Sequence, residues 1–393
     1  MRTGAALVAV SATALACSPA ERAPVSSGDT APVPGASASV EVKSLNAPLP
    51  AAPAPTGCGA SAVSTMSTRD KLAQLLMVGV TGADDARAVV ADHHVGGIFI
   101  GSWTDLSMLS NGALAGIANS AGPMALAVSV DEEGGQVSRL SPLIGSAPSA
   151  RTLAQTGTPQ QAYDQALSRG RQMRGLGITI DFAPVVDVDG GNSAIGDRSF
   201  GSDPEVVTQY AGAYARGLRD AGVLPVLKHF PGHGSASGDS HTGGVTTPPL
   251  TEMQNVDLVP YRTLVSQAPV AVMIGHLQVP GLTGDVPASL SPAAVALLRG
   301  GGGYGAPPFN GPVFTDDLSG MAAITARYGI AEAALRALQA GADQALWLST
   351  SEVPAVLDRL EAAVASGELS PAAVDASVHR MAAVKGQGPQ CGG

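Results

Sequence analysis

The residues best suited to chemistry in this sequence are an aspartate and a histidine two positions apart, and a second aspartate at the end of an apolar run. Asp239 and His241 lie in a glycine- and serine-rich segment, residues 232–244. A carboxylate bonded to one ring nitrogen orients an imidazole and stabilises its cation, so the other nitrogen can transfer a proton. Asp316 follows the run Val313–Thr315, where a sheet would hold its carboxylate still. A fixed carboxylate and a proton donor are what cleavage of a glycosidic bond needs.

The histidine spacing also allows a metal site. His229 and His233 are four residues apart, and Asp239 and His241 follow them, so a three-histidine metallohydrolase site is an alternative. The Phe-Pro-Gly between the first two histidines cannot form the helix that would place both imidazoles on one face. We therefore expect no metal and no organic cofactor.

Eight short apolar runs precede or carry these polar residues. They are Leu75–Val80, Gly97–Ile100, Ala125–Val130, Ile178–Val186, Leu224–Lys228, Ala271–Ile274, Val313–Thr315 and Ala345–Leu348. Between them lie helix-forming stretches, Asp84–Asp92, Gln160–Leu176, Pro204–Ala221, Met321–Ala340 and Val353–Ala365. Alternation of buried strands with helices predicts a parallel sheet, and eight units predict a (β/α)8 TIM barrel. A doubly wound sheet is the alternative, but no glycine-rich nucleotide fingerprint follows the first run.

Polar clusters follow five of the apolar runs. They are Asp131–Gly135, Asp187–Asp189, His229–Gly234, His276 and Asp316–Asp317. In a barrel the carboxyl ends of all strands meet at one rim, where catalytic groups gather. The five clusters together predict an active site on that rim, although each alone could be a cap or a turn.

One long motif connects these clusters to a known family. Lys228-His-Phe-Pro-Gly-His-Gly234, followed after four residues by Asp239-Ser-His241, resembles the signature of glycoside hydrolase family 3, in its β-N-acetylglucosaminidase branch. Further segments match in family order: Asp131–Gly135, Phe182–Asp187, Asp197–Gly201, Pro287–Ser291 and Phe314–Ser319. The matches extend over essentially the whole folded part of the chain.

The resemblance implies a barrel that carries a retaining exo-glycosidase site. It implies that Asp316 is the nucleophile that forms a glycosyl-enzyme. It implies that His241 is the acid/base on a mobile loop, with Asp239 as its orienting partner.

The resemblance also implies which residues bind the terminal sugar. Asp131, Arg198, Lys228 and His229 match positions that bond its hydroxyls. We expect His276 to line the pocket, with a core histidine as the alternative, and Asp317 to bond nearby backbone. The expected substrate is a small carbohydrate, terminal β-linked N-acetylglucosamine on cell-wall fragments.

Some features depart from the family pattern or leave alternatives open. Ser235-Ala236 stands where many relatives have Asp-Thr, and Glu132 where many have Gln. An imidazole acid/base is compatible with an anionic acceptor, so phosphorolysis is an alternative reaction.

Relatives that act on glucosides commonly carry a second α/β domain, whereas few residues follow Ser349 here. We expect two closing helices, no C-terminal α/β sandwich domain, and the aminosugar branch rather than a β-glucosidase.

The first residues indicate export. Residues 1–17 contain one arginine and an apolar run that is too short to cross a bilayer and fits a signal peptide. The run ends in a lipobox-like Ala-Leu-Ala before Cys17, although leucine normally stands where Ala14 does. We expect lipidation at Cys17, which would anchor the protein at the outer face of the membrane or in the cell wall or periplasmic space.

A tether and a disulfide complete the expected organisation. Residues 18–57 are rich in proline, alanine and serine, contain no aromatic residue, and are expected to form an extended tether. Residues 58–393 are expected to form the catalytic domain. Because an exported protein can hold disulfides and domain termini often lie close together, we expect a Cys58–Cys391 bridge; two free thiols are the alternative.

Composition excludes some function classes. The chain has 393 residues, 45% of them hydrophobic, which is enough for a large core. Its 22 basic residues are outnumbered by 32 acidic ones and its aromatic share is 4%. We therefore expect no nucleic-acid partner, a monomer, and membrane contact only through the lipid. A non-catalytic, wall-binding lipoprotein remains the rival to an enzyme.

Overall fold

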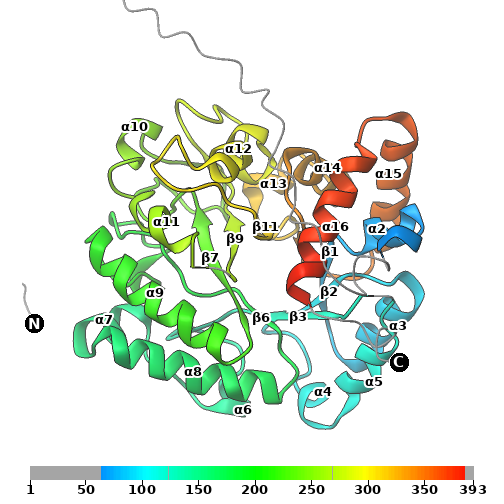
Figure 1. Ribbon diagram of the computed structural model, residues 1–393, viewed down its shortest axis with the longest axis horizontal. Coiled ribbons are helices and arrows are strands. Elements are labelled where there is room, and N and C mark those ends of the chain that lie inside the picture. Colours follow the sequence, from blue (N-terminus) through cyan, green and yellow to red (C-terminus); the bar gives the residue numbers. More distant parts are fainter. Residues whose placement is uncertain (1–62, 123, 268, 386–393) are drawn as a thin grey trace, which may run out of the picture. The chain divides into compact units, whose positions relative to one another are not determined.

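Eight strands form one sheet in which every neighbouring pair is parallel. The computed structural model describes residues 63–122, 124–267 and 269–385. The sheet order is β11-β9-β7-β6-β3-β2-β1-β12, with helices around it (Figure 1). The strands are β1 (Leu76–Val80), β2 (Gly97–Ile100), β3 (Ala127–Val130), β6 (Ile180–Asp181), β7 (Leu224–Phe230), β9 (Ala271–Ile274), β11 (Val313–Thr315) and β12 (Ala345–Trp347). Each overlaps one of the eight predicted apolar runs.

The two edge strands, β11 and β12, contact each other, so the sheet closes. Phe314 and Gln344 form a parallel bridge, and the Thr315 backbone N–H donates to the Gln344 carbonyl at 3.1 Å. A closed parallel sheet of eight strands with outer helices is the predicted (β/α)8 barrel. The doubly wound alternative is thereby excluded.

Helices cover the outside of the barrel. They include α2 (Thr68–Ala73), α3 (Ala83–His93), α5 (Ala113–Asn119), α7 (Ala150–Thr156), α8 (Pro159–Gly175), α9 (Pro204–Asp220), α11 (Val259–Leu264), α12 (Pro292–Gly300), α14 (Ile330–Ala340), α15 (Val353–Ser366) and α16 (Pro371–Lys385). Side chains cap the N-termini of several of these helices. At α2 the Ser67 hydroxyl accepts a bond from the Asp70 N–H at 3.1 Å, and at α8 Thr158 and Gln161 form a capping box. The two closing helices expected after residue 349 are α15 and α16.

The prediction of one helix over Met321–Ala340 is wrong. The structure has a single turn, α13 (Ala322–Thr325), and after a break α14, which begins at Ile330. The Ala323 N–H donates to the Ser240 carbonyl at 3.2 Å. This contact ties α13 to the loop between β7 and β8 (Val245–Thr246), which local sequence could not indicate.

Aromatic side chains fill the interior of the barrel. The Phe182 ring lies 5.8 Å from that of Phe99 and 5.5 Å from that of Phe314, measured between centroids. All three side chains are buried. Packed aromatic rings therefore close the barrel below the rim.

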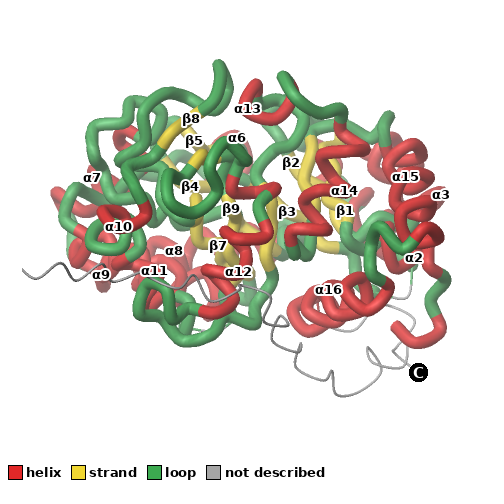
Figure 2. Tube along the Cα trace, turned by 90° about the horizontal axis from the view of Figure 1, so that it is seen from above, coloured by secondary structure: helices red, strands yellow, loops and turns green. Residues whose placement is uncertain are grey.

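The carboxyl ends of the strands carry additional small elements. Figure 2 shows β4 (Glu132–Gly134), β5 (Val137–Ser138), β8 and α13 on one side of the strands, and α12 and α16 on the other. β8 pairs with β10 (Leu277–Gln278), and β4 pairs with β5 as a hairpin. These elements build up the rim on which the predicted site residues stand.

Several predictions concern residues outside the described ranges. These are the signal peptide of residues 1–17, lipidation at Cys17, the tether of residues 18–57, and the Cys58–Cys391 disulfide. Among the residues that are described, no helix is both long and apolar enough to cross a membrane.

Candidate active site

A cavity of about 300 Å³ opens at the carboxyl ends of the strands. Seven of the predicted site residues line it: Asp131, Arg198, Lys228, His229, Asp239, His241 and Asp316. Its other lining residues include Phe99, Gly101, Trp103, Glu133, Gln136, Val137, Arg139, His233, Ser240, Asp317, Met321 and Leu348. The structure thus brings the predicted nucleophile and the predicted acid/base to one cavity, as the barrel argument requires.

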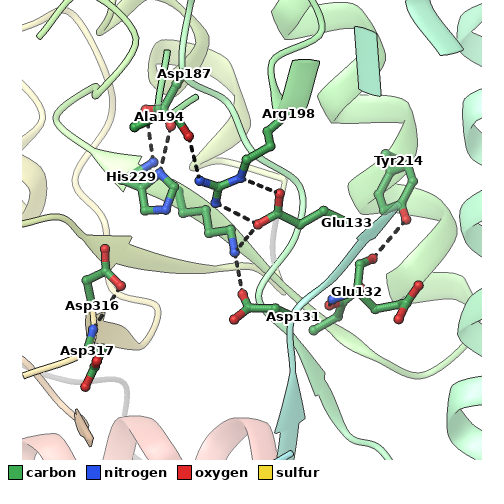
Figure 3. A network of polar contacts seen from close by, with 12 residues as sticks. Asp131, Glu132, Glu133, Asp187, Ala194, Arg198, Tyr214, His229, Asp316 and Asp317 are labelled. Atoms are coloured by element: carbon green, nitrogen blue, oxygen red, sulfur yellow. Dashed lines mark hydrogen bonds and ion pairs between the residues drawn. The ribbon is translucent and has the colours of Figure 1, made fainter. Parts of the chain in front are cut away.

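Four charged residues at one side of the cavity form a connected array (Figure 3). Lys228 Nζ lies 2.5 Å from Asp131 Oδ1 and 2.6 Å from Glu133 Oε1. The Arg198 guanidinium binds Glu133 through Nε and Nη2, both at 2.8 Å. Such a two-point bond fixes the plane of the carboxylate as well as its position. We call these four residues the charged array.

Glu133, Arg198 and Lys228 of this array remain ionised at neutral pH. Burial would raise the pKa of Glu133, but Arg198 and Lys228 outweigh burial and lower it. Burial would lower the pKa of Lys228, but Asp131 and Glu133 raise it. The array therefore presents fixed charges to a bound ligand.

Asp187, at the end of the segment that follows β6, holds two histidines in place. Its Oδ2 lies 2.7 Å from His229 Nδ1, and its Oδ1 accepts bonds from the backbone N–H of His229 at 3.1 Å and of His233 at 2.7 Å. Burial would raise the pKa of Asp187, but the two histidines lower it. With Nδ1 committed to Asp187, His229 has Nε2 available for the cavity.

Asp316 follows β11, and its backbone N–H donates to the Ile274 carbonyl at 3.1 Å. Its Oδ1 accepts the Asp317 N–H at 2.9 Å. Burial would raise its pKa, but His229, His276 and the Asp317 N–H lower it below the ordinary value. The carboxylate is therefore ionised and firmly placed.

Asp317 bonds nearby backbone, as predicted. Its Oδ1 accepts the Ser319 N–H at 2.8 Å and the Ser319 hydroxyl at 2.6 Å, and its Oδ2 accepts the Gly320 N–H at 2.7 Å. These bonds shape the turn after Asp316 and use up both oxygens of Asp317.

Asp239 and His241 pair on the loop that joins β7 to β8, residues 231–244. His241 Nδ1 lies 2.8 Å from Asp239 Oδ1, which also accepts the His241 backbone N–H at 3.0 Å. The His241 N–H bond and the imidazole lower the pKa of Asp239. The His241 side chain is 61% exposed, so its Nε2 is free to meet a ligand.

Comparison with known proteins agrees with this geometry. The family model described as "Glycosyl hydrolase family 3 N terminal domain" matches residues 67–384. This chain belongs to glycoside hydrolase family 3. It is 64% identical over 396 residues to the beta-hexosaminidase LpqI of Mycobacterium tuberculosis. The match covers 100% of this chain and 99% of that protein.

Solved structures of family 3 proteins have the same barrel. The structure of M. tuberculosis LpqI superposes with a TM-score of 0.83 at 69% identity, over 86% of this chain and 100% of that one. A family 3 β-N-acetylglucosaminidase from Paenibacillus superposes with a TM-score of 0.75 at 36% identity, over 82% of this chain and 62% of that one. The chain is thus an enzyme of the glycoside hydrolase class.

His276 does not line the cavity, so the expectation that it would is wrong. Its Nε2 lies 2.7 Å from the Asp317 carbonyl, and its Nδ1 lies 2.7 Å from the Ser289 hydroxyl. Burial lowers its pKa. The neutral His276 ring, with both nitrogens bonded, links the Asp316–Asp317 turn to Ser289. This is the core-histidine alternative.

The three residues that depart from the family 3 pattern have defined surroundings. Burial raises the pKa of the nearby Asp257 carboxyl, and the hydroxyl and the backbone N–H of Ser235 partly offset this rise. The carbonyl of Ala236 accepts a bond from Asn192 Nδ2 at 2.7 Å. Glu132 is buried away from the cavity, where Arg169 Nη2 lies 2.5 Å from its Oε1. Glu132 thus anchors the β4–β5 hairpin to α8.

Three residues of this family 3 site were not predicted from the sequence. Glu133 and Asp187 lie inside the motifs Asp131–Gly135 and Phe182–Asp187, where the only signal is an acid close behind a predicted apolar run. Arg139 lines the cavity half-buried, with no bonded partner in the described part of the chain. The same part contains no group of three His, Cys, Asp or Glu side chains arranged to hold a metal.

Proposed function

We propose that this enzyme is a retaining exo-β-N-acetylglucosaminidase that acts on peptidoglycan-derived fragments through a covalent glycosyl-Asp316 intermediate. One observation carries the proposal. Asp131, Glu133, Asp239 and Asp317 each bond a neighbouring side chain, whereas Asp316 bonds only a backbone N–H in the described structure. A carboxylate that is fixed in position, ionised and not paired with a cationic side chain has the properties of a nucleophile.

In the first step an oxygen of Asp316 forms a bond to the anomeric carbon while the bond to the leaving oxygen breaks. His241 donates its Nε2 proton to that oxygen, so the leaving group departs as a neutral alcohol. Asp239, 2.8 Å from Nδ1, stabilises the imidazolium that carries the proton beforehand and orients the ring.

In the second step water displaces the sugar from Asp316. His241 Nε2 accepts a proton from the water, whose oxygen bonds to the anomeric carbon as the bond to Asp316 breaks. Two displacements at one carbon return the original configuration. Asp316 and His241 are both regenerated.

The charged array supports selection of the terminal sugar. Asp131 and Glu133 offer acceptors, and Arg198 and Lys228 offer donors, at fixed positions on one wall of the cavity. A sugar epimer that misplaced a hydroxyl would lose a hydrogen bond to one of these charged groups, which costs about 1.5–3 kcal/mol.

The preference for N-acetylglucosamine is supported by the relatives. The M. tuberculosis relative is named a beta-hexosaminidase and the Paenibacillus one a β-N-acetylglucosaminidase. The peptidoglycan origin of the substrate rests on the predicted export and lipidation at Cys17, which would hold the enzyme in the cell envelope.

The test is turnover of a chromogenic N-acetylglucosaminide against the matching glucoside, with the Asp316→Asn variant as control. We expect the N-acetylglucosaminide to be favoured and the variant to be inactive. Proton NMR of early product should show the β-anomer of the released sugar first. A first product in the α-configuration would contradict the retaining mechanism, and preference for the glucoside would contradict the substrate.

The alternatives have distinct products. Phosphorolysis would give N-acetylglucosamine 1-phosphate in phosphate buffer, whereas hydrolysis gives the free sugar in any buffer. A wall-binding protein without catalysis would bind the N-acetylglucosaminide and release nothing.

A further inference from the structure

Trp103 is the largest of the exposed apolar side chains in the described structure, and it lines the cavity. It is 43% exposed, whereas Trp347, the other tryptophan of the chain, is fully buried. Trp103 follows β2, on the same rim as the predicted catalytic residues. An indole left partly in water at the mouth of a binding cavity carries apolar surface that a ligand can cover.

One face of the indole is already covered. A Cβ added to Gly101 would lie 2.4–2.5 Å from three atoms of the six-membered ring of Trp103. Nearly equal distances to three consecutive ring atoms mean that the ring lies flat over Gly101. A larger residue at position 101 would displace the indole from this position, so the exposed surface of Trp103 lies on the ring edges and on the face turned away from Gly101.

The backbone beside Trp103 is fixed by bonds of Thr104, and the indole packs between Gly101 and Phe99. The Thr104 hydroxyl donates to the Val80 carbonyl at 2.6 Å and accepts the Gly101 N–H at 3.0 Å. The Phe99 ring lies 6.1 Å from that of Trp103, at an interplanar angle of 50°. A ring fixed in this way loses little conformational entropy when a ligand packs on it.

The depth of Trp103 indicates which part of a substrate it meets. The side chains of Lys228, Glu133, Arg198 and Asp131 are 2%, 4%, 18% and 24% exposed, so the charged array lies deeper than Trp103. Trp103 and His241 lie at the mouth. If the terminal sugar fills the deep part, the leaving group projects outward to the level of Trp103.

We propose that Trp103 forms a second sugar subsite, in which the pyranose ring of the leaving sugar stacks on the open indole face. The proposal rests on the proposed function, because the function defines which sugar lies deep and which one leaves. The C–H face of a pyranose is apolar and matches an aromatic ring in size, whereas a small alkyl leaving group covers little of it.

The first test measures binding without turnover. In the Asp316→Asn variant we expect N,N′-diacetylchitobiose to change tryptophan emission, and N-acetylglucosamine alone to leave it constant. The added Trp103→Phe substitution should remove the change, because the remaining Trp347 is buried. Equal changes with both sugars, or calorimetric binding of the disaccharide with constant emission, would overturn the proposal.

The second test compares kcat/KM for the disaccharide with kcat/KM for methyl β-N-acetylglucosaminide. We expect Trp103→Ala to lower the ratio between these two values about tenfold and Trp103→Phe to restore most of it. Val286→Ala, an exposed side chain away from the cavity, is the matched control. An unchanged ratio for Trp103→Ala would overturn the subsite. If the wild-type enzyme released no sugar from either substrate, the proposed function would fail. The emission test would still show whether a disaccharide binds against Trp103.

Discussion

The charged array and the loop of residues 231–244 hold the two halves of the proposed chemistry in opposite ways. Lys228 and Glu133 of the array are buried, Asp131 and Arg198 are partly buried, and each of its cations bonds at least one carboxylate at 2.8 Å or less. The loop leaves the Asp239–His241 pair exposed to solvent. The difference teaches that the deep wall is preorganised to bind, whereas the proton-transfer group stays free to approach and withdraw.

The largest expected effect is at Asp316, which belongs to the fixed region. Asp316→Ala removes the proposed nucleophile, and we expect kcat to fall by about 10⁴-fold or more. Initial rates with a chromogenic N-acetylglucosaminide measure this. Added azide should restore part of the rate by attacking the anomeric carbon from the vacated side. Residual activity within tenfold of wild type would remove Asp316 from the mechanism.

The next largest effect is expected at Glu133, which holds the array together. Glu133→Gln leaves Lys228 and Arg198 without their shared anion, so we expect kcat/KM to fall by about 10³-fold and the free energy of unfolding by about 3 kcal/mol. Chemical denaturation and steady-state kinetics measure the two. Glu332→Gln, which breaks partly exposed pairs with Arg336 and Arg359, is the control and should cost less than about 1 kcal/mol. Equal losses in the two variants would mean that burial of the array does not matter.

A smaller and more selective effect is expected at His241. His241→Ala should slow substrates with poor leaving groups by about 100-fold, and those with good leaving groups much less, because only the former need a proton. Rates for a series of aryl N-acetylglucosaminides with different leaving-group pKa values measure this. A uniform loss across the series would show that His241 is not the acid.

The smallest effect concerns Asp257, a buried residue whose side chain packs against Gly232 of the loop. Burial raises the pKa of Asp257 to about 6. Since the folded protein then binds this proton more tightly than the unfolded chain, Asp257 lowers stability as pH rises from about 4 through 6. We expect the free energy of unfolding of Asp257→Asn to exceed that of wild type by about 2 kcal/mol at pH 7 and to match it near pH 4. Denaturation at several pH values measures this, and a difference independent of pH would contradict the titration of Asp257.

The sequence was sufficient for the barrel because buried parallel strands read as short apolar runs, and all eight runs contain strands. It was sufficient to place seven of the predicted residues at one cavity, because their motifs follow those strands; their roles stay predictions. It was not sufficient for Asp187, whose role comes from bonds to His229 and His233 on another strand end. Nor could the sequence distinguish a pocket histidine from a core histidine at position 276, since residue spacing does not show that the ring bonds Ser289.

The packed rings of Phe99, Phe182 and Phe314 have a consequence for the order of events in each catalytic cycle. They close the inner end of the cavity in the described structure, so substrate enters and products leave at the rim. In the proposed mechanism the leaving group must therefore diffuse out of the cavity before water can reach the sugar bound to Asp316, and that sugar leaves last. Accumulated monosaccharide should therefore obstruct the empty enzyme, and a long glycan must detach after every cut rather than slide forward.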